Sequence, residues 1–254
     1  MGAVKSRRIE GVGTTDAQWA ASTALQGVAQ TGLAELVPPG ARAVIVAPHP
    51  DDEILGCGGL MRRLAAAGHA ILLLAVTDGG GSHPGSTAWP VDRLTAARRD
   101  ETREALARLG VSEQVTVRRL GFTDGGLGAE ATALTDALRA AVEPGDVVFA
   151  TWEYDGHPDH EVVGRCARDV AAARGARLVQ VPIWAWHWAT PEDPRMPWTT
   201  ARRLPLGEPD LGAKERALNA FTSQITPDPS TGRAPILPAW ALARMLRPFE
   251  VYFP

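Results

Sequence analysis

The stretch AVIVAPHPDDE, residues 43–53, joins a continuous apolar run to a turn dense in imidazole and carboxylate groups. A short apolar run bounded by a turn is typical of a strand that is buried on both faces. A helical pattern follows at residues 53–67, and the same order of apolar run and amphipathic segment returns along the chain. This alternation predicts a series of βα units.

Five apolar runs have the length and composition of buried strands: 43–47, 71–76, 115–120, 147–152 and 178–184. Four longer amphipathic segments separate them and predict helices: 53–67, 91–109, 129–142 and 161–174. Continuous apolar strands separated by helices imply a parallel sheet that is covered on both sides. We therefore expect an α/β fold, Rossmann-like, with a mostly parallel sheet and helices on both faces.

The remaining segments are expected to extend the same single domain, residues 1–254. Residues 1–38 are predicted to form an N-terminal helical extension, with one helix from Asp16 to Leu36 that begins after an N-cap at Thr15. Residues 189–254 are predicted to complete the substrate side, with helices near 211–221 and 240–246 and a last strand at 250–253.

The composition excludes several functional classes. A chain of 254 residues with 45% hydrophobic and 22% charged residues is typical of a globular protein, and a net charge of -3 without long basic runs argues against nucleic-acid binding. The longest apolar run, residues 70–76, is far shorter than the roughly 20 residues of a membrane span. Without a signal-peptide pattern, we expect a cytoplasmic protein, and a homo-oligomer stays open. Cys57 and Cys166 are expected as buried thiols.

Histidine and carboxylate side chains gather after two of the predicted strands. PHPDDE at 48–53 follows the first strand and DGHPDHE at 155–161 follows the fourth. In an open α/β sheet, the ligand site lies at the carboxyl ends of the strands. His49 and Asp52 are three residues apart, so that both can reach one divalent ion, and either His157 or His160 can supply a third ligand.

Such a site leaves Asp51 free to act as a general base on a metal-bound water. The alternative is that each string only caps the helix that follows it, since carboxylates at helix N-termini are common. One string alone would leave the two interpretations about equal. Two strings at the ends of two strands favour the metal site.

The two strings resemble the signatures of the LmbE-like, or PIG-L, family of zinc-dependent N-acetylglucosamine deacetylases. The resemblance extends from Ala43 to the C-terminus. It implies a hydrolase that removes an N-acetyl or N-acyl group from a small-molecule amino-sugar conjugate, with a zinc-bound water as the nucleophile. An amidase that acts on a larger thiol-conjugate amide, or a catalytically silent sugar-binding relative, is the alternative.

The resemblance also implies roles for individual residues. The zinc ligands fall on His49, Asp52 and His160, and the general base falls on Asp51. The histidine that assists the oxyanion or the leaving amine, in its protonated form, falls on His157. Two histidines and one aspartate accept either Zn²⁺ or Fe²⁺.

Four further residues are expected to contact the substrate. The resemblance places a sugar-binding arginine on Arg98 and a hydroxyl contact on Asp124. Trp186 and His187 belong to a tryptophan-rich segment after the fifth strand, where aromatic faces are able to stack on a sugar ring. The alternative for this segment is ordinary core packing.

Overall fold

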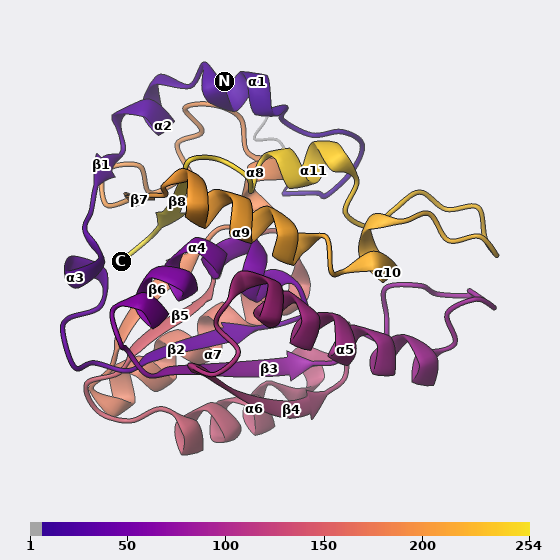
Figure 1. Ribbon diagram of the computed structural model, residues 1–254, viewed down its shortest axis with the longest axis horizontal. Coiled ribbons are helices and arrows are strands. Elements are labelled where there is room, and N and C mark those ends of the chain that lie inside the picture. The colour runs from indigo at the N-terminus through magenta and orange to yellow at the C-terminus, as the bar shows by residue number, and fades with distance from the viewer. Residues whose placement is uncertain (1–6) are drawn as a thin grey trace.

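A computed structural model of the chain describes residues 7–254. Its main sheet contains five parallel strands in the order β4-β3-β2-β5-β6 (Figure 1). The strands are β2 (Ala43–Ala47), β3 (Ile71–Thr77), β4 (Val115–Phe122), β5 (Val147–Thr151) and β6 (Arg177–Val181). The expected parallel sheet is confirmed. Because the chain runs outward from β2 to β4 and then returns to β5, the strand order reverses between β2 and β5, where ligands bind in folds of this type.

Helices cover both faces of this sheet because successive strand residues point to opposite sides. Val44 and Val46 of β2 pack toward α6 (Leu127–Ala141) and α7 (Pro158–Arg174). Ala43 and Ile45 pack toward α4 (Asp52–Ala66) and α5 (Val91–Leu109). Both clusters are buried, and the near-continuous apolar strands of the sequence are thereby explained.

A smaller sheet in the order β1-β7-β8 joins the N-terminal region to the C-terminal part. It consists of β1 (Ala29–Gln30), β7 (Arg202–Pro205) and β8 (Phe249–Tyr252), and a bridge between Gln180 and Phe253 links it to β6. The helices of this part are α8 (Ala185–Trp188), α9 (Glu208–Leu218), α10 (Thr222–Ile225) and α11 (Ala239–Ala243). Strand β7 has no counterpart among the predicted elements.

The N-terminal helix predicted from Asp16 to Leu36 is wrong. The segment forms three short helices, α1 (Asp16–Ala20), α2 (Thr23–Gly27) and α3 (Leu33–Leu36), with β1 between the last two. Thr15 does cap the first helix, but the Ser22 side chain accepts from the Leu25 N–H and starts a second one. Residues 1–6 of the expected extension lie outside the described residues.

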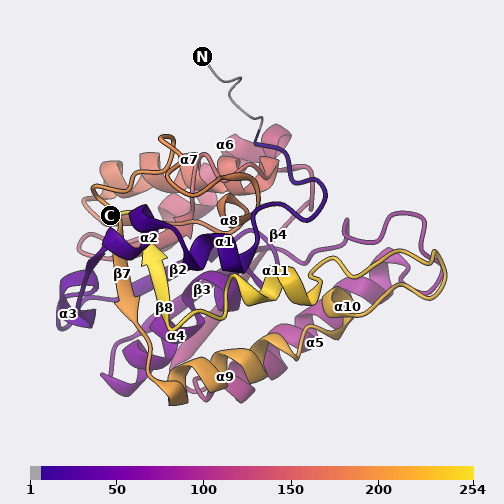
Figure 2. The same ribbon diagram turned by 90° about the horizontal axis from the view of Figure 1, so that it is seen from above.

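Two loops extend side by side from the body of the molecule, one after β3 and one after α10 (Figures 1 and 2). The Ser230 hydroxyl of the second loop accepts hydrogen bonds from the N–H groups of Thr87 and Ala88 in the first. Arg233 also donates to the carbonyl of Pro84. Among residues 7–254, no helix is both long and apolar enough to cross a membrane.

Candidate active site

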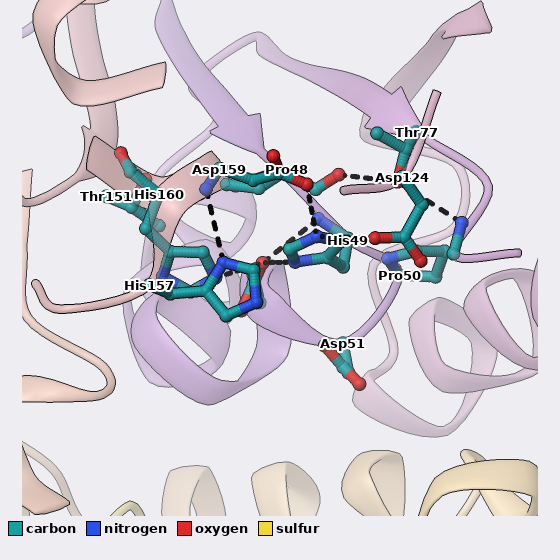
Figure 3. A network of polar contacts seen from close by, with 12 residues as sticks. Pro48, His49, Pro50, Asp51, Thr77, Asp124, Thr151, His157, Asp159 and His160 are labelled. Carbon is teal, nitrogen blue, oxygen red and sulfur yellow. Dashed lines mark hydrogen bonds and ion pairs between the residues drawn. The ribbon is translucent and has the colours of Figure 1, made fainter. Parts of the chain in front are cut away.

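The two histidine-containing segments meet where the strand order reverses (Figure 3). The loop after β2 is fixed at Pro48, whose carbonyl accepts hydrogen bonds from the backbone N–H and the hydroxyl of Thr77 at 3.1 and 2.9 Å. The segment after β5 leads into α7, with His157 at its N-cap and His160 in its first turn. The proximity of these segments, expected from the sequence, follows from the parallel pairing of β2 with β5.

Asp52 lies between two imidazoles. Its Oδ2 atom is 3.2 Å from Nδ1 of His49 and 3.2 Å from Nε2 of His160. Asp52 and His160 are buried, and His49 is nearly so. Of the two candidates for the third ligand, His160 is the histidine that contacts Asp52.

His160 is held in one tautomer by a buried carboxylate. Its Nδ1 atom lies 2.8 Å from Oδ2 of Asp155, and the Asp155 carboxylate also accepts hydrogen bonds from three backbone N–H groups, those of Ile183, Trp184 and Ala185. Nδ1 therefore carries the proton. Nε2 is buried and faces Oδ2 of Asp52 at 3.2 Å, but it forms no hydrogen bond of good geometry among the described residues. A nitrogen lone pair that faces a carboxylate is costly to bury unless a cation lies between them, so this arrangement fits a metal ion.

His49 is oriented in a similar way by carboxylates on its other side. Its Nε2 atom lies 3.1 Å from Oδ1 of Asp124 and 3.2 Å from Oδ2 of Asp159. These carboxylates favour a proton on Nε2 and leave the Nδ1 lone pair facing Asp52. Burial lowers the pKa of His49, but Asp124, Asp159 and Asp52 together raise it well above its ordinary value.

The donor set fits a divalent cation. Two imidazole nitrogens and one carboxylate oxygen are ligands that zinc and ferrous iron share. Burial opposes protonation of His160, yet Asp52 and Asp155 raise the pKa of its imidazole to about 9. Excess negative charge of this kind is what a bound cation would neutralise.

His157 lies beside this set without contacting Asp52. Its ring centroid is 4.9 Å from that of His49 and 4.8 Å from that of His160. Nδ1 of His157 accepts a hydrogen bond from the Asp159 N–H at 3.3 Å, so the proton of the neutral ring resides on Nε2. Burial, together with His160 and His49, lowers the pKa of His157 to about 4. Without a metal, His157 is thus an uncharged hydrogen-bond donor at neutral pH, and the protonated form expected during the reaction stays a prediction.

Asp51 is the strained residue of the site. Its φ of 128° is one that L side chains rarely adopt, and the structure holds it with two contacts. The Asp51 N–H donates to Oε2 of Glu53, and Nη2 of Arg98 lies 2.9 Å from Oδ2 of Asp51. Burial raises the pKa of Asp51 to about 8, with Arg98 opposing the shift.

Arg98 holds the loop of Asp51 in place. Besides Asp51, its guanidinium donates to the backbone carbonyls of Pro50 and Gly79, which ties the strained loop to the end of β3. Arg98 also lines the cavity next to the metal ligands, so its expected contact with a sugar stays a prediction.

A cavity of about 310 Å³ opens at these residues. His49, Asp51, Asp52, Arg98, Asp124 and His157 all line it. The other lining side chains come from distant parts of the chain. Leu55, Trp184, Ile236 and Leu237 form an apolar wall, and Ser82 and Gln224 add two polar groups.

Two of the expected substrate contacts lie elsewhere. Trp186 is 4% exposed, donates its Nε1–H to the carbonyl of Pro182 and packs edge-on against Trp19. His187 is also buried, between the carbonyl of Glu10 and the guanidinium of Arg244. Neither residue lines the cavity, and core packing explains both. From the tryptophan-rich segment, it is Trp184 that reaches the cavity.

Comparison with known proteins places this site in a family. Residues 44–171 match the model of the PIG-L family, described as GlcNAc-PI de-N-acetylase. The chain is 29% identical over 248 residues to the 1D-myo-inositol 2-acetamido-2-deoxy-alpha-D-glucopyranoside deacetylase of Rhodococcus jostii, covering 74% of this chain and 83% of the relative. It is 32% identical over 152 residues to the 2'-N-acetylparomamine deacetylase of Streptomyces fradiae, a match that spans only 53% of each protein.

Solved structures agree with this assignment. A conserved protein from Thermus thermophilus aligns with a TM-score of 0.54 and 30% identity over 73% of this chain and 80% of that protein. The A40926 pseudoaglycone deacetylase shares the fold at 21% identity, with a TM-score of 0.61 over 84% of this chain and 96% of that protein. The segment that matches the family model contains β3, β4 and β5 and both histidine strings, and the chain belongs to the PIG-L (LmbE-like) family of deacetylases.

Proposed function

We propose that this protein is a metal-dependent deacetylase that hydrolyses the N-acetyl amide of an amino-sugar conjugate. The relatives are named as deacetylases of an inositol-linked acetamidoglucose and of an acetylated paromamine. The observation that carries the proposal is that Nδ1 of His49 and Nε2 of His160 converge on the carboxylate of Asp52, beside a cavity that Asp51 lines.

The metal would be held by Nδ1 of His49, a carboxylate oxygen of Asp52 and Nε2 of His160. When bound there, zinc or ferrous iron supplies Lewis-acid polarisation of the amide carbonyl and lowers the pKa of a water molecule. The protein contributes the fixed tautomers. Asp155 secures the His160 ring, and Asp124 with Asp159 secures the His49 ring.

Asp51 is proposed as the general base. It adjoins Asp52 in the chain, and its carboxylate lies in the cavity without being shared with either ligand imidazole. A raised pKa makes this carboxylate a stronger base than an exposed aspartate, which suits proton removal from water. Arg98 keeps the group in place by its contact with Oδ2.

His157 is proposed to donate a hydrogen bond from Nε2 to the carbonyl oxygen as negative charge develops there, while the proton that Asp51 has taken from water passes to the departing amine nitrogen. Its neutral state is suited to hydrogen-bond donation, and the Asp159 N–H fixes which nitrogen carries the proton. Water adds to the amide carbonyl, the C–N bond breaks, and acetate and a free amino sugar are the products.

The test is acetate release from a panel of N-acetylglucosamine conjugates that includes inositol and aminocyclitol glycosides. We expect release from at least one member, its loss after treatment with a chelator and its return with zinc. An amine product that still carries its aglycone distinguishes deacetylation from cleavage of the glycosidic bond. Sugar binding without acetate release from any conjugate would contradict the proposal and favour a silent relative.

A further inference from the structure

The cavity is lined by a polar side chain that the proposed reaction does not use. Gln224 lies in α10, near the base of the long loop pair, is only 1% exposed and lines the cavity. Its Nε2 atom lies 2.8 Å from Oγ of Ser223 and 3.4 Å from Oγ of Ser82.

The neighbouring hydrogen bonds fix which way the Gln224 amide faces. The Ser223 hydroxyl lies 2.7 Å from Oε2 of Glu101, and the other oxygen of Glu101 accepts from the Ser223 N–H and the Thr222 hydroxyl. A carboxylate only accepts hydrogen bonds, so the Ser223 hydroxyl donates its single proton to Glu101. Ser223 must then accept from Gln224, and the amide nitrogen, rather than the amide oxygen, points at it.

The amide oxygen of Gln224, Oε1, therefore has no hydrogen-bond donor in the described part of the chain. Within residues 7–254, Oε1 of Gln224 receives no hydrogen bond, although the side chain is almost completely buried. A carbonyl oxygen without a donor gains from a hydrogen bond, and the side chain that carries this one lines the cavity. The oxygen is poised to accept a hydrogen bond from a molecule in the cavity.

The position of Gln224 indicates which part of that molecule it would meet. Its hydrogen bonds run to Ser82, Ser223 and nearby backbone, and none reaches the described residues of the two metal-site loops. Asp124, the hydroxyl contact expected from the sequence, already has one oxygen at the Gly81 N–H and the other at His49. Gln224 has an acceptor that is not yet engaged.

We propose that Oε1 of Gln224 accepts a hydrogen bond from a ring hydroxyl of the sugar, away from the acetamido group, and thereby selects the substrate. Glu101 and Ser223 are positioning residues that orient the amide. The inference rests on the proposed function in that it takes the ligand to be an amino sugar. It commits to a hydroxyl, a neutral donor, as the recognised group.

The experiment measures binding, so that it does not depend on turnover. The dissociation constant of methyl 2-amino-2-deoxy-glucopyranoside, the amine that deacetylation of the corresponding glycoside would yield, is determined by calorimetry with zinc-loaded protein. The 3-, 4- and 6-deoxy analogues are measured beside it. Gln224→Met retains the length of the side chain and removes the acceptor, and exposed Gln114→Met is the matched control.

We expect Gln224→Met to weaken binding of the parent sugar about 3- to 10-fold, as for one net hydrogen bond. One deoxy analogue should bind the wild type and Gln224→Met equally, because the lost hydroxyl and the lost acceptor are partners. Undiminished binding of the parent, an equal loss with all analogues, or no binding to the wild type would overturn the inference. Absence of acetate release with binding retained counts against the proposed function alone.

Ser223→Ala provides the second variant, because it removes the group that orients the amide without touching the sugar. It should weaken binding of the parent sugar in the wild-type background and have no further effect when combined with Gln224→Met. An additive loss in the double variant would show a general structural role and contradict the positioning assignment. Thermal melting of each variant verifies that the protein is folded.

Discussion

Asp51 and Asp52 are neighbours in the chain, yet their surroundings shift their pKa values in opposite directions. Burial raises the pKa of Asp51 to about 8, and adjacent carboxylates add to the shift. Burial acts in the same sense on Asp52, but the imidazoles of His160 and His49 outweigh it and lower the pKa of that group. One carboxylate thus stays a ligand while the other is suited to exchange a proton.

Substitution separates these two roles. Asp51→Asn retains the size of the side chain and the ligand set, so we expect full zinc content with a fall in kcat of about 10²- to 10⁴-fold. His49→Ala removes a ligand and should lose zinc as well as activity. Metal analysis of the purified variants together with acetate release measures both effects. Full zinc in His49→Ala would contradict the ligand assignment.

His157 makes the stability of the metal-free protein sensitive to pH. Burial lowers its pKa to about 4 in the folded state, whereas an unfolded histidine titrates near 6.5. Between these values the unfolded chain binds the extra proton, so His157 lowers the free energy of unfolding as the pH falls from 6.5 to 4.

Urea unfolding of chelator-treated wild type and His157→Asn across this range checks the effect. The variant should lose less stability than the wild type as the pH falls. Parallel stability curves for the two proteins would show that His157 is not held neutral by its surroundings.

At the scale of elements, the position of α7 relative to β5 decides where His157 and His160 lie. Gly164 permits the close approach, because a Cβ atom there would lie 2.5 Å from the carbonyl oxygen of Thr151 and 2.7 Å from the N atom of Glu153. A helix that carries two site residues is therefore packed directly on the strand end beside them.

Gly164→Ala should push α7 away from the strand, lower the free energy of unfolding by about 1–3 kcal/mol and weaken zinc binding. Gly128→Ala in α6 is the matched control, since nothing lies within 4 Å of its added methyl group. That control should be neutral or gain up to about 1 kcal/mol. Urea unfolding and zinc titration of both variants provide the comparison, and identical behaviour would contradict the packing argument.

The sequence predicts those elements that have a long periodic pattern. The boundaries of α5 agree with the prediction, and the strands that flank the site differ by only a few residues, because burial on both faces demands continuous apolar runs. The N-terminal helix failed because Ser22 offers a local cap that competes with continuation. Strand β7 was not predicted, because its four residues are too few to show an alternation of apolar and polar side chains.

Some residues of the site could likewise be predicted from the sequence, and others could not. His49, Asp52 and His160 could be predicted because strand ends converge in a parallel sheet, so two strings distant in the chain must meet. Trp184 and Trp186 are two residues apart at a short helix, and only the packing of α1 against this segment decides which one is buried. Gln224 lies far from both strings in the chain, and the fold brings it to the cavity.

Across the whole molecule, a buried ion pair within the C-terminal part supports the contact of that part with the Rossmann-like core. Nζ of Lys214 on α9 lies 2.7 Å from Oε1 of Glu250 on β8, and both side chains are buried. The carboxylate of Glu250 also accepts hydrogen bonds from the N–H groups of Gly59 and Leu60 in α4. This contact joins the C-terminal part to the helix that begins at Asp52.

Lys214→Met leaves the Glu250 charge buried and without its cation, so we expect a loss of about 3–5 kcal/mol in the free energy of unfolding. The exposed pair of Arg108 and Glu104 is the control, and Arg108→Met should cost about 1 kcal/mol or less. Chemical unfolding of both variants measures the difference. Equal effects would mean that the buried pair contributes no more to stability than the exposed one.

The central claim is that one divalent ion, held by His49, Asp52 and His160, is needed for an amino-sugar deacetylation in this cavity. It is tested most directly by adding zinc stepwise to the metal-free protein and measuring acetate release from an N-acetylglucosamine conjugate at each step. The account predicts no release without zinc and a linear rise that ends at one equivalent per chain. Release by the zinc-free protein, or none at one equivalent with any conjugate of the panel, would contradict it.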